Sequence, residues 1–111
     1  MSASLPAAMT LEEIKARLGG DERLAEAGAY QFSLDPAHVT FRLGRRNPNH
    51  VRTVMVSFEP NGLFGMDCFG ALEPGAFRAP RIASAHDVLP DNLATVFGQL
   101  TGMDAFHHHH F

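Results

Sequence analysis

The amino-acid sequence predicts an α+β domain built around one antiparallel sheet. Residues 51–72 contain two alternating apolar segments joined by a tight turn, residues 30–43 contain a second such pair, and each end of the chain carries an amphipathic helical pattern. Because the strand pairs follow one another directly, the simplest topology is a four-stranded antiparallel meander. We expect the N-terminal and C-terminal helices to pack on one face of this sheet.

The hairpin at residues 51–72 has a register that its turn determines. Pro60 suits the second position of a type I turn, and Gly62 can take the left-handed conformation that closes a three-residue loop with a bulge. This turn pairs Phe58 with Phe64, and the alternation then gives the hairpin one apolar face. A slip of one residue would mix apolar and polar side chains on that face.

The hairpin at residues 30–43 repeats the same logic. Asp35 and Pro36 fit the first two positions of a type I turn in a four-residue loop. The pairs predicted across this loop are Leu34 with Val39, Phe32 with Phe41, and Tyr30 with Leu43. The sheet should therefore be apolar on one face and mostly polar on the other.

Helical patterns flank the predicted strands. Thr10 begins a capping box, and the helix that follows carries Leu11, Ile14 and Leu18 at helical spacing. Residues 21–27 can add another helical turn. The last helix should start near residue 90 and end at Gly102, and its apolar stripe contains Leu93, Val96, Phe97 and Leu100.

The segment between the sheet and the last helix has no clear periodicity. Residues 73–83 contain two prolines and a glycine, which predicts a surface loop, with Phe77 and Ile82 turned inward. Ser84 can cap a single helical turn over residues 84–88.

Length and composition indicate one soluble domain, residues 1–103, followed by a His-rich tail, residues 104–111. The 111 residues are 45% hydrophobic and 19% charged, and a net charge of −3 gives no general attraction to nucleic acid or anionic lipid. The chain starts without a signal-like segment and has no run of roughly 20 apolar residues. Eight of the nine basic residues are Arg, as GC-rich bacterial genomes favour. We expect a cytoplasmic bacterial protein.

Cys68 is the only cysteine, so an internal disulfide is excluded and a reducing compartment is the simplest setting. The predicted register places it on the inward face of its strand. We therefore interpret Cys68 as a small core residue and not as a nucleophile.

Basic side chains cluster around the connection at residues 44–50. The cluster contains Arg42, Arg45, Arg46, His50 and Arg52. Guanidinium groups match phosphate and carboxylate oxygens in a planar, two-pronged geometry, so the cluster could hold an anionic ligand or an acidic protein surface. A solvated hairpin loop is the alternative interpretation.

The outward face of the sheet is a second candidate site. The register places Thr53 across from Phe69 and Met55 across from Asp67 on that face. A Phe and a Met among polar side chains suggest a contact surface, either for another protein or for a second copy of the chain. A tolerated apolar surface is the alternative.

The tail contains four consecutive imidazoles. His107, His108, His109 and His110 follow Asp104, and neutral imidazole is a common ligand for zinc, nickel and copper. A purification tag, an inert tail and a segment that docks on a partner are alternatives.

Function follows only partly from these features. The sequence lacks an HExxH, paired-Cys or GxSxG motif, which argues against an enzyme of those classes. The leading hypothesis is an accessory or adaptor protein that binds a protein partner, or itself, through the open sheet face and the tail. The alternative is a transition-metal- or anion-binding domain, with or without enzymatic activity, that uses the His tail or the Arg-rich loop. Nucleic acid and membranes are not expected as partners.

Overall fold

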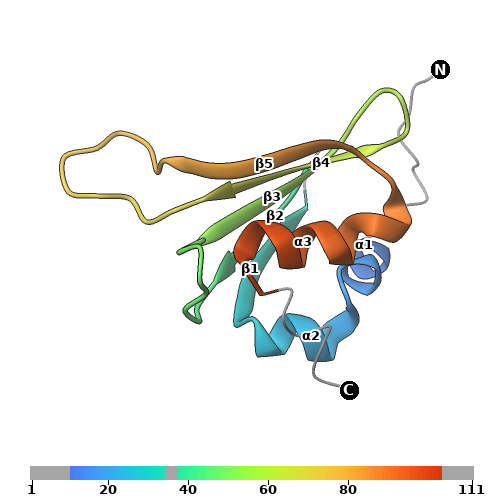
Figure 1. Ribbon diagram of the computed structural model, residues 1–111, viewed down its shortest axis with the longest axis horizontal. Helices are drawn as coiled ribbons and strands as arrows, with labels where there is room; N and C mark the ends of the chain where they lie inside the picture. Colours follow the sequence, from blue (N-terminus) through green and yellow to red (C-terminus); the bar gives the residue numbers. More distant parts are fainter. Residues whose placement is uncertain (1–10, 35–37, 104–111) are drawn as a thin grey trace.

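A computed structural model describes residues 11–34 and 38–103 and shows an α+β fold (Figure 1). It contains a five-stranded antiparallel sheet and three α-helices. In chain order the elements are α1 (Leu11–Arg17), α2 (Gly20–Glu26), β1 (Ala29–Leu34), β2 (His38–Leu43), β3 (Thr53–Phe58), β4 (Phe64–Phe69), β5 (Arg81–Val88), the 3-10 helix η1 (Pro90–Asn92) and α3 (Leu93–Thr101).

The sheet is a meander in which each strand pairs with the next, in the order β1-β2-β3-β4-β5. The register predicted for β3 and β4 is confirmed, with Phe58 opposite Phe64. The turn is also as predicted: the Glu59 amide donates to the Leu63 carbonyl at 3.0 Å, and Gly62 has φ 85°. Turn chemistry and apolar alternation therefore determine this hairpin together.

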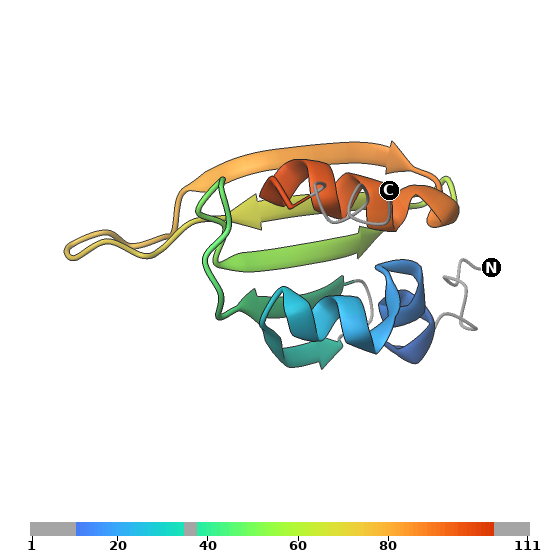
Figure 2. The same ribbon diagram turned by 60° about the horizontal axis from the view of Figure 1, so that its bottom comes forward.

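The three helices lie on the same side of the sheet (Figures 1 and 2). The core between them is apolar, and Phe41 is fully buried in it. Its ring stacks on Phe32 at 5.0 Å between centroids and meets Phe97 of α3 at 5.9 Å. On the outer side of Phe32, the Lys15 ammonium of α1 lies 4.3 Å from the ring centroid. Aromatic contacts thus connect two strands with two of the helices.

The prediction of four strands is wrong, because residues 81–88 form a fifth strand and not a helical turn. Ala83 and Ala85 favour helix over strand, so local propensity concealed the alternation. In the sheet, however, Ala83 pairs with Cys68 and Ala85 pairs with Met66, so the small side chains lie beside buried residues of β4. Pairing with the preceding strand β4 overrides the local preference.

The register predicted for β1 and β2 is correct near the turn and wrong at the far end. Leu34 pairs with Val39 as expected, but Leu43 pairs with Ala29 and not with Tyr30. The register shifts within β1, where Gln31 has a positive φ of 56°. A bulge of this kind adds one residue to the strand and leaves Tyr30 exposed at the edge of the sheet.

Residues 70–80 form a narrow ribbon that projects beyond the sheet (Figure 2). The Gly70 amide donates to the Pro80 carbonyl at 2.9 Å, which extends the β4–β5 ladder to the base of the ribbon. Phe77 is fully exposed and Ile82 is 42% exposed, so the expectation that both turn inward is wrong. The Gly70–Pro80 bond closes the ribbon at its base, and a turn bond from the Ala76 amide to the Glu73 carbonyl at 3.0 Å lies nearer its tip.

Cys68 lies in the core, as its register predicted, with no exposed surface. Burial, with a smaller contribution from the neighbouring Asp67 carboxylate, raises the pKa of the thiol to about 12. At neutral pH the group is therefore an inert thiol. None of the helices in residues 11–34 and 38–103 combines the length and apolar character needed to cross a membrane.

We expect the free energy of unfolding to fall as the pH rises from about 9 to about 12. In this window the thiol of the unfolded chain ionises, whereas the folded thiol with its raised pKa stays protonated. The loss is roughly 1.4 kcal/mol per pH unit. Urea unfolding of the wild type and of Cys68→Ala at about pH 7 and about pH 10 would measure it, because only the wild type contains the thiol. A stability difference between the two proteins that does not change with pH would contradict this prediction.

Candidate functional site

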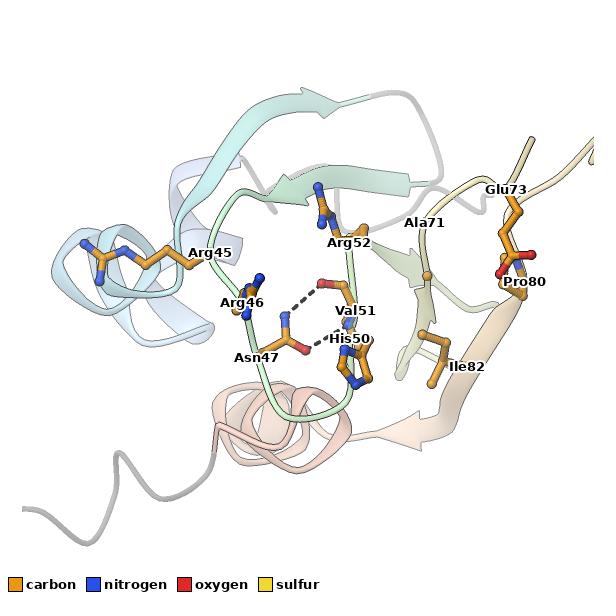
Figure 3. Close-up of a pocket in the computed structure, with 11 residues that line it drawn as sticks. Arg45, Arg46, Asn47, His50, Val51, Arg52, Ala71, Glu73, Pro80 and Ile82 are labelled. Carbon is orange, nitrogen blue, oxygen red and sulfur yellow. Dashed lines mark hydrogen bonds between the residues drawn. The ribbon is translucent and has the colours of Figure 1, made fainter.

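A cleft of about 560 Å³ opens at the end of the sheet where β2 connects to β3 and β4 connects to β5 (Figure 3). One side is the basic loop, defined as residues 44–52, and the other is the base of the ribbon with the start of β5. The residues that line it are Arg45, Arg46, Asn47, His50, Val51, Arg52, Gly70, Ala71, Glu73, Pro80 and Ile82.

The structure brings together the basic residues that the sequence singled out. Arg45, Arg46, His50 and Arg52 all line the cleft. Arg42 lines an adjoining, smaller cleft of about 200 Å³, to which Arg52 also contributes. Arg52 is therefore the basic side chain shared by the two clefts.

Asn47 holds the basic loop in one shape. This buried side chain accepts a hydrogen bond from the Val51 amide and donates one to the Val51 carbonyl, both at 2.8 Å (Figure 3). The two bonds close the loop across four residues, as a strand pair would. Between them the His50 amide donates to the Asn47 carbonyl at 3.0 Å, and His50 has a positive φ of 60°. Such a conformation persists only where the surrounding contacts enforce it.

The basic loop is also anchored to the end of α3. The Asn49 side chain donates to the Leu100 carbonyl at 2.9 Å, and the Asn49 amide donates to the Thr101 carbonyl at 3.3 Å. These bonds satisfy carbonyl groups that the helix end would otherwise leave without a partner. Gly102, with φ 80°, lets Pro48 approach closely, since a Cβ there would lie 2.9 Å from the Pro48 Cβ. The loop is thus fixed on the helix as well as within itself.

Arg52 is positioned by the sheet. Its amide donates to the Phe69 carbonyl at 2.7 Å, and its carbonyl accepts from the Leu43 amide at 2.8 Å. The backbone of Arg52 therefore continues the ladder between β2 and β4, while its side chain is exposed at the cleft. Its guanidinium emerges from a rigid position.

The cleft carries excess positive charge. In the part of the chain that the structure describes, no carboxylate pairs with Arg45, Arg46 or Arg52. By contrast, Arg17 pairs with Asp91, and the Arg81 guanidinium lies 3.4 Å from the Asp67 carboxylate. Glu73 is the one acidic residue among those that line the cleft, and it lies across from the basic loop (Figure 3). The Arg45 side chain extends away from the other labelled side chains in the same view. Arg46, His50 and Arg52 are therefore the side chains best placed to donate hydrogen bonds to a ligand.

The open face of the sheet has the register that the sequence predicted. Thr53 lies opposite Phe69, and Met55 lies opposite Asp67. Thr53, Met55 and Phe69 are half-buried, but Asp67 is only 7% exposed. Its carboxylate accepts a hydrogen bond from the Arg81 guanidinium of β5, which reduces its availability to a partner.

A second polar cluster lies at the opposite end of the sheet, at the β3–β4 turn. His86 Nδ1 lies 3.0 Å from Glu59 Oε2, and the Asn61 side chain donates to the Asp87 carboxylate at 3.1 Å. These contacts join the end of β5 to the turn, where Asp87 has a positive φ of 57°. We interpret the cluster as a structural contact that holds the edge strand β5 against the β3–β4 turn, since the His86 and Glu59 side chains contact each other.

The His tail, with His107, His108, His109 and His110, lies outside the described residues. Metal binding by zinc, nickel or copper there stays a prediction. Within residues 11–34 and 38–103, no group of three or more His, Cys, Asp or Glu side chains is arranged to hold a metal ion.

Sequence reasoning missed the residues that make the basic loop into one wall of a cleft. Asn47 is followed by Pro48, a pair typical of turns, which could have indicated a side chain that bonds to its own loop. Pro80 and Ile82 gave no such signal, because their place beside the loop depends on the fifth strand. Comparisons of the chain with protein-family models, with curated proteins and with solved structures gave no match.

Proposed function

We propose that this chain is an anion-binding domain whose ligand sits in the cleft between the basic loop and β5. The observation that carries this proposal is the position of Arg46, His50 and Arg52 around one cleft of about 560 Å³, without a carboxylate partner among the described residues. Cations gathered in a concave site attract anions more strongly than the same cations spread over a convex surface.

The chemistry of the side chains and the rigidity of the backbone both support this proposal. Guanidinium groups donate paired hydrogen bonds to oxyanions, and such charge-assisted bonds are stronger than neutral ones. Because Asn47 and Asn49 fix the loop before any ligand arrives, little ordering remains to be done on binding. Clefts of about 300–1,000 Å³ are the usual size for small-molecule ligands.

A second candidate function is self-association through the open sheet face. No helix covers that face in Figures 1 and 2, and Met55 and Phe69 lie on it as diagonal neighbours on adjacent strands, with their side chains half-buried. An apolar patch between strands of one sheet suits a two-fold contact with a second copy. We place this candidate second because Asp67, at its centre, is already paired with Arg81.

Replacing the central arginines should weaken anion binding. We expect Arg46→Gln and Arg52→Gln each to weaken the binding of inorganic phosphate about tenfold or more, because a charge-assisted hydrogen bond contributes roughly 1.5–3 kcal/mol. Chemical-shift titration by NMR would measure affinity and location together. Arg78→Gln is the matched control, since Arg78 is exposed on the ribbon and lines neither cleft. Equal effects of all three variants, or shifts scattered over the surface, would refute the proposal.

Removing the Asn47 side chain should weaken phosphate binding without removing a charge. We expect Asn47→Ala to cost about 1–3 kcal/mol of folding stability, because two buried backbone groups of Val51 lose their partner. The loosened loop should also bind phosphate more weakly. Asn61→Ala is the control, since Asn61 also makes two hydrogen bonds but lies at the far end of the sheet. Unchanged phosphate affinity in Asn47→Ala would show that loop rigidity is unimportant.

Self-association predicts a concentration-dependent mass that depends on the open face. We expect Met55→Lys with Phe69→Lys to shift the protein to a monomer in size-exclusion chromatography with light scattering, because two like charges would face each other across the contact. Leu89→Lys is the control, as Leu89 is 53% exposed and lies after β5, outside the sheet. A wild type that remains monomeric at every concentration would eliminate this candidate.

A further inference from the structure

The two walls of the cleft differ in chemistry. The basic loop supplies Arg46, His50 and Arg52, whereas the opposite wall consists largely of apolar groups from Ala71, Pro80 and Ile82. Figure 3 shows Pro80 and Ile82 on the opposite side of the cleft from Arg46. A bare inorganic anion on the basic wall would leave this apolar wall against water, and most of the 560 Å³ would stay unfilled by the ligand.

Ile82 is directed to the cleft by an irregularity in β5. The β4–β5 register passes from Cys68 opposite Ala83 to Phe69 opposite Arg81, so Ile82 is the extra residue of a bulge. Bulges of this kind redirect a side chain out of the regular alternation and are frequent beside binding sites. As a result, a large apolar side chain is 42% exposed inside a cleft, where a solvent-facing polar residue would be the default.

Gly70 provides the room for this arrangement. A Cβ at position 70 would lie 2.9 Å from the Ile82 Cδ1, so a side chain there would displace the end of the Ile82 side chain from its present position. The apolar wall therefore depends on two backbone features, the bulge at Ile82 and the glycine at position 70, as well as on the rotamer of Ile82.

Charge determines which end of a ligand faces which wall. Glu73 lies at the apolar side of the cleft, so a negative group there would be repelled. The anionic group of a ligand should lie against Arg46 and Arg52, with its remaining part toward Ile82.

From these features, and resting on the proposed anion-binding function, we infer that the ligand is an amphipathic organic anion. It would carry a phosphate or carboxylate group on an apolar part of about the size of an aromatic ring. The oxyanion would bind the basic loop, and the apolar part would pack on Ile82 and Pro80.

Calorimetric titration with inorganic phosphate, phenyl phosphate and benzoate tests this inference on the intact chain. Phenyl phosphate should bind roughly tenfold to a hundredfold more tightly than inorganic phosphate, because burial of an aromatic ring contributes that much to affinity. Benzoate distinguishes a carboxylate ligand from a phosphate ligand. Equal affinities for inorganic phosphate and phenyl phosphate would overturn the amphipathic ligand while leaving the anion site intact, and no binding of any of the three probes would overturn both.

Two variants test the contributions of the two walls of the cleft separately. Ile82→Ser should weaken the binding of phenyl phosphate about tenfold and leave the binding of inorganic phosphate unchanged, whereas Arg52→Gln should weaken the binding of both. Leu89→Ser is the control, because Leu89 is also exposed but lines neither cleft. An Ile82→Ser variant that loses both probes equally while its circular dichroism spectrum stays that of the wild type would contradict the assignment of the apolar wall. If Ile82→Ser does not fold, the wild-type ratio of the two affinities still decides the question.

Discussion

The register of the β3–β4 hairpin determines the core and the cleft together, because one alignment sets the side-chain direction along both strands. At the turn, Gly62 closes the loop and pairs Phe58 with Phe64. At the other end of the same ladder, the Arg52 amide donates to the Phe69 carbonyl, which brings the basic loop beside the base of the ribbon. A slip of one residue would expose the apolar face and would also move Arg52 relative to the opposite wall of the cleft. The same hydrogen bonds thus serve stability and the site.

The basic loop concentrates positive charge, and its backbone bonds hold that charge in place. In water, like charges repel by only about 1 kcal/mol even at a separation of about 4 Å, so placing Arg46 and Arg52 in one exposed cleft has a modest electrostatic cost. A typical intramolecular hydrogen bond contributes about 0.5–1.5 kcal/mol, and the side chains of Asn47 and Asn49 supply three. These bonds can offset both the repulsion and the positive φ of His50. The charges are therefore stably arranged before any ligand is present.

Features that depend on neighbouring residues could be predicted from the sequence, and features that depend on distant pairing could not. The β3–β4 register follows from a local turn, and the basic residues are adjacent in the chain, so both were recognised. The strand at residues 81–88 was not, since Ala83 and Ala85 favour helix and acquire strand geometry only through β4. The register shift in β1 at Gln31 and the bulge at Ile82 also depend on tertiary pairing. Each adds a residue to a strand without a signal in the sequence, so neither could be predicted.

The fifth strand is also what gives the basic loop a second wall. With four strands, the loop would lie at an open end of the sheet, where an Arg-rich connection is ordinarily a solvated turn. Pairing of β5 with β4 returns the chain to this end and places Pro80 and Ile82 across from Arg46. The arginines then lie in a concave site beside apolar groups, where water screens their charges less than it would on an open surface. The same pairing that the sequence concealed is thus the feature that favours a binding site over a solvated loop.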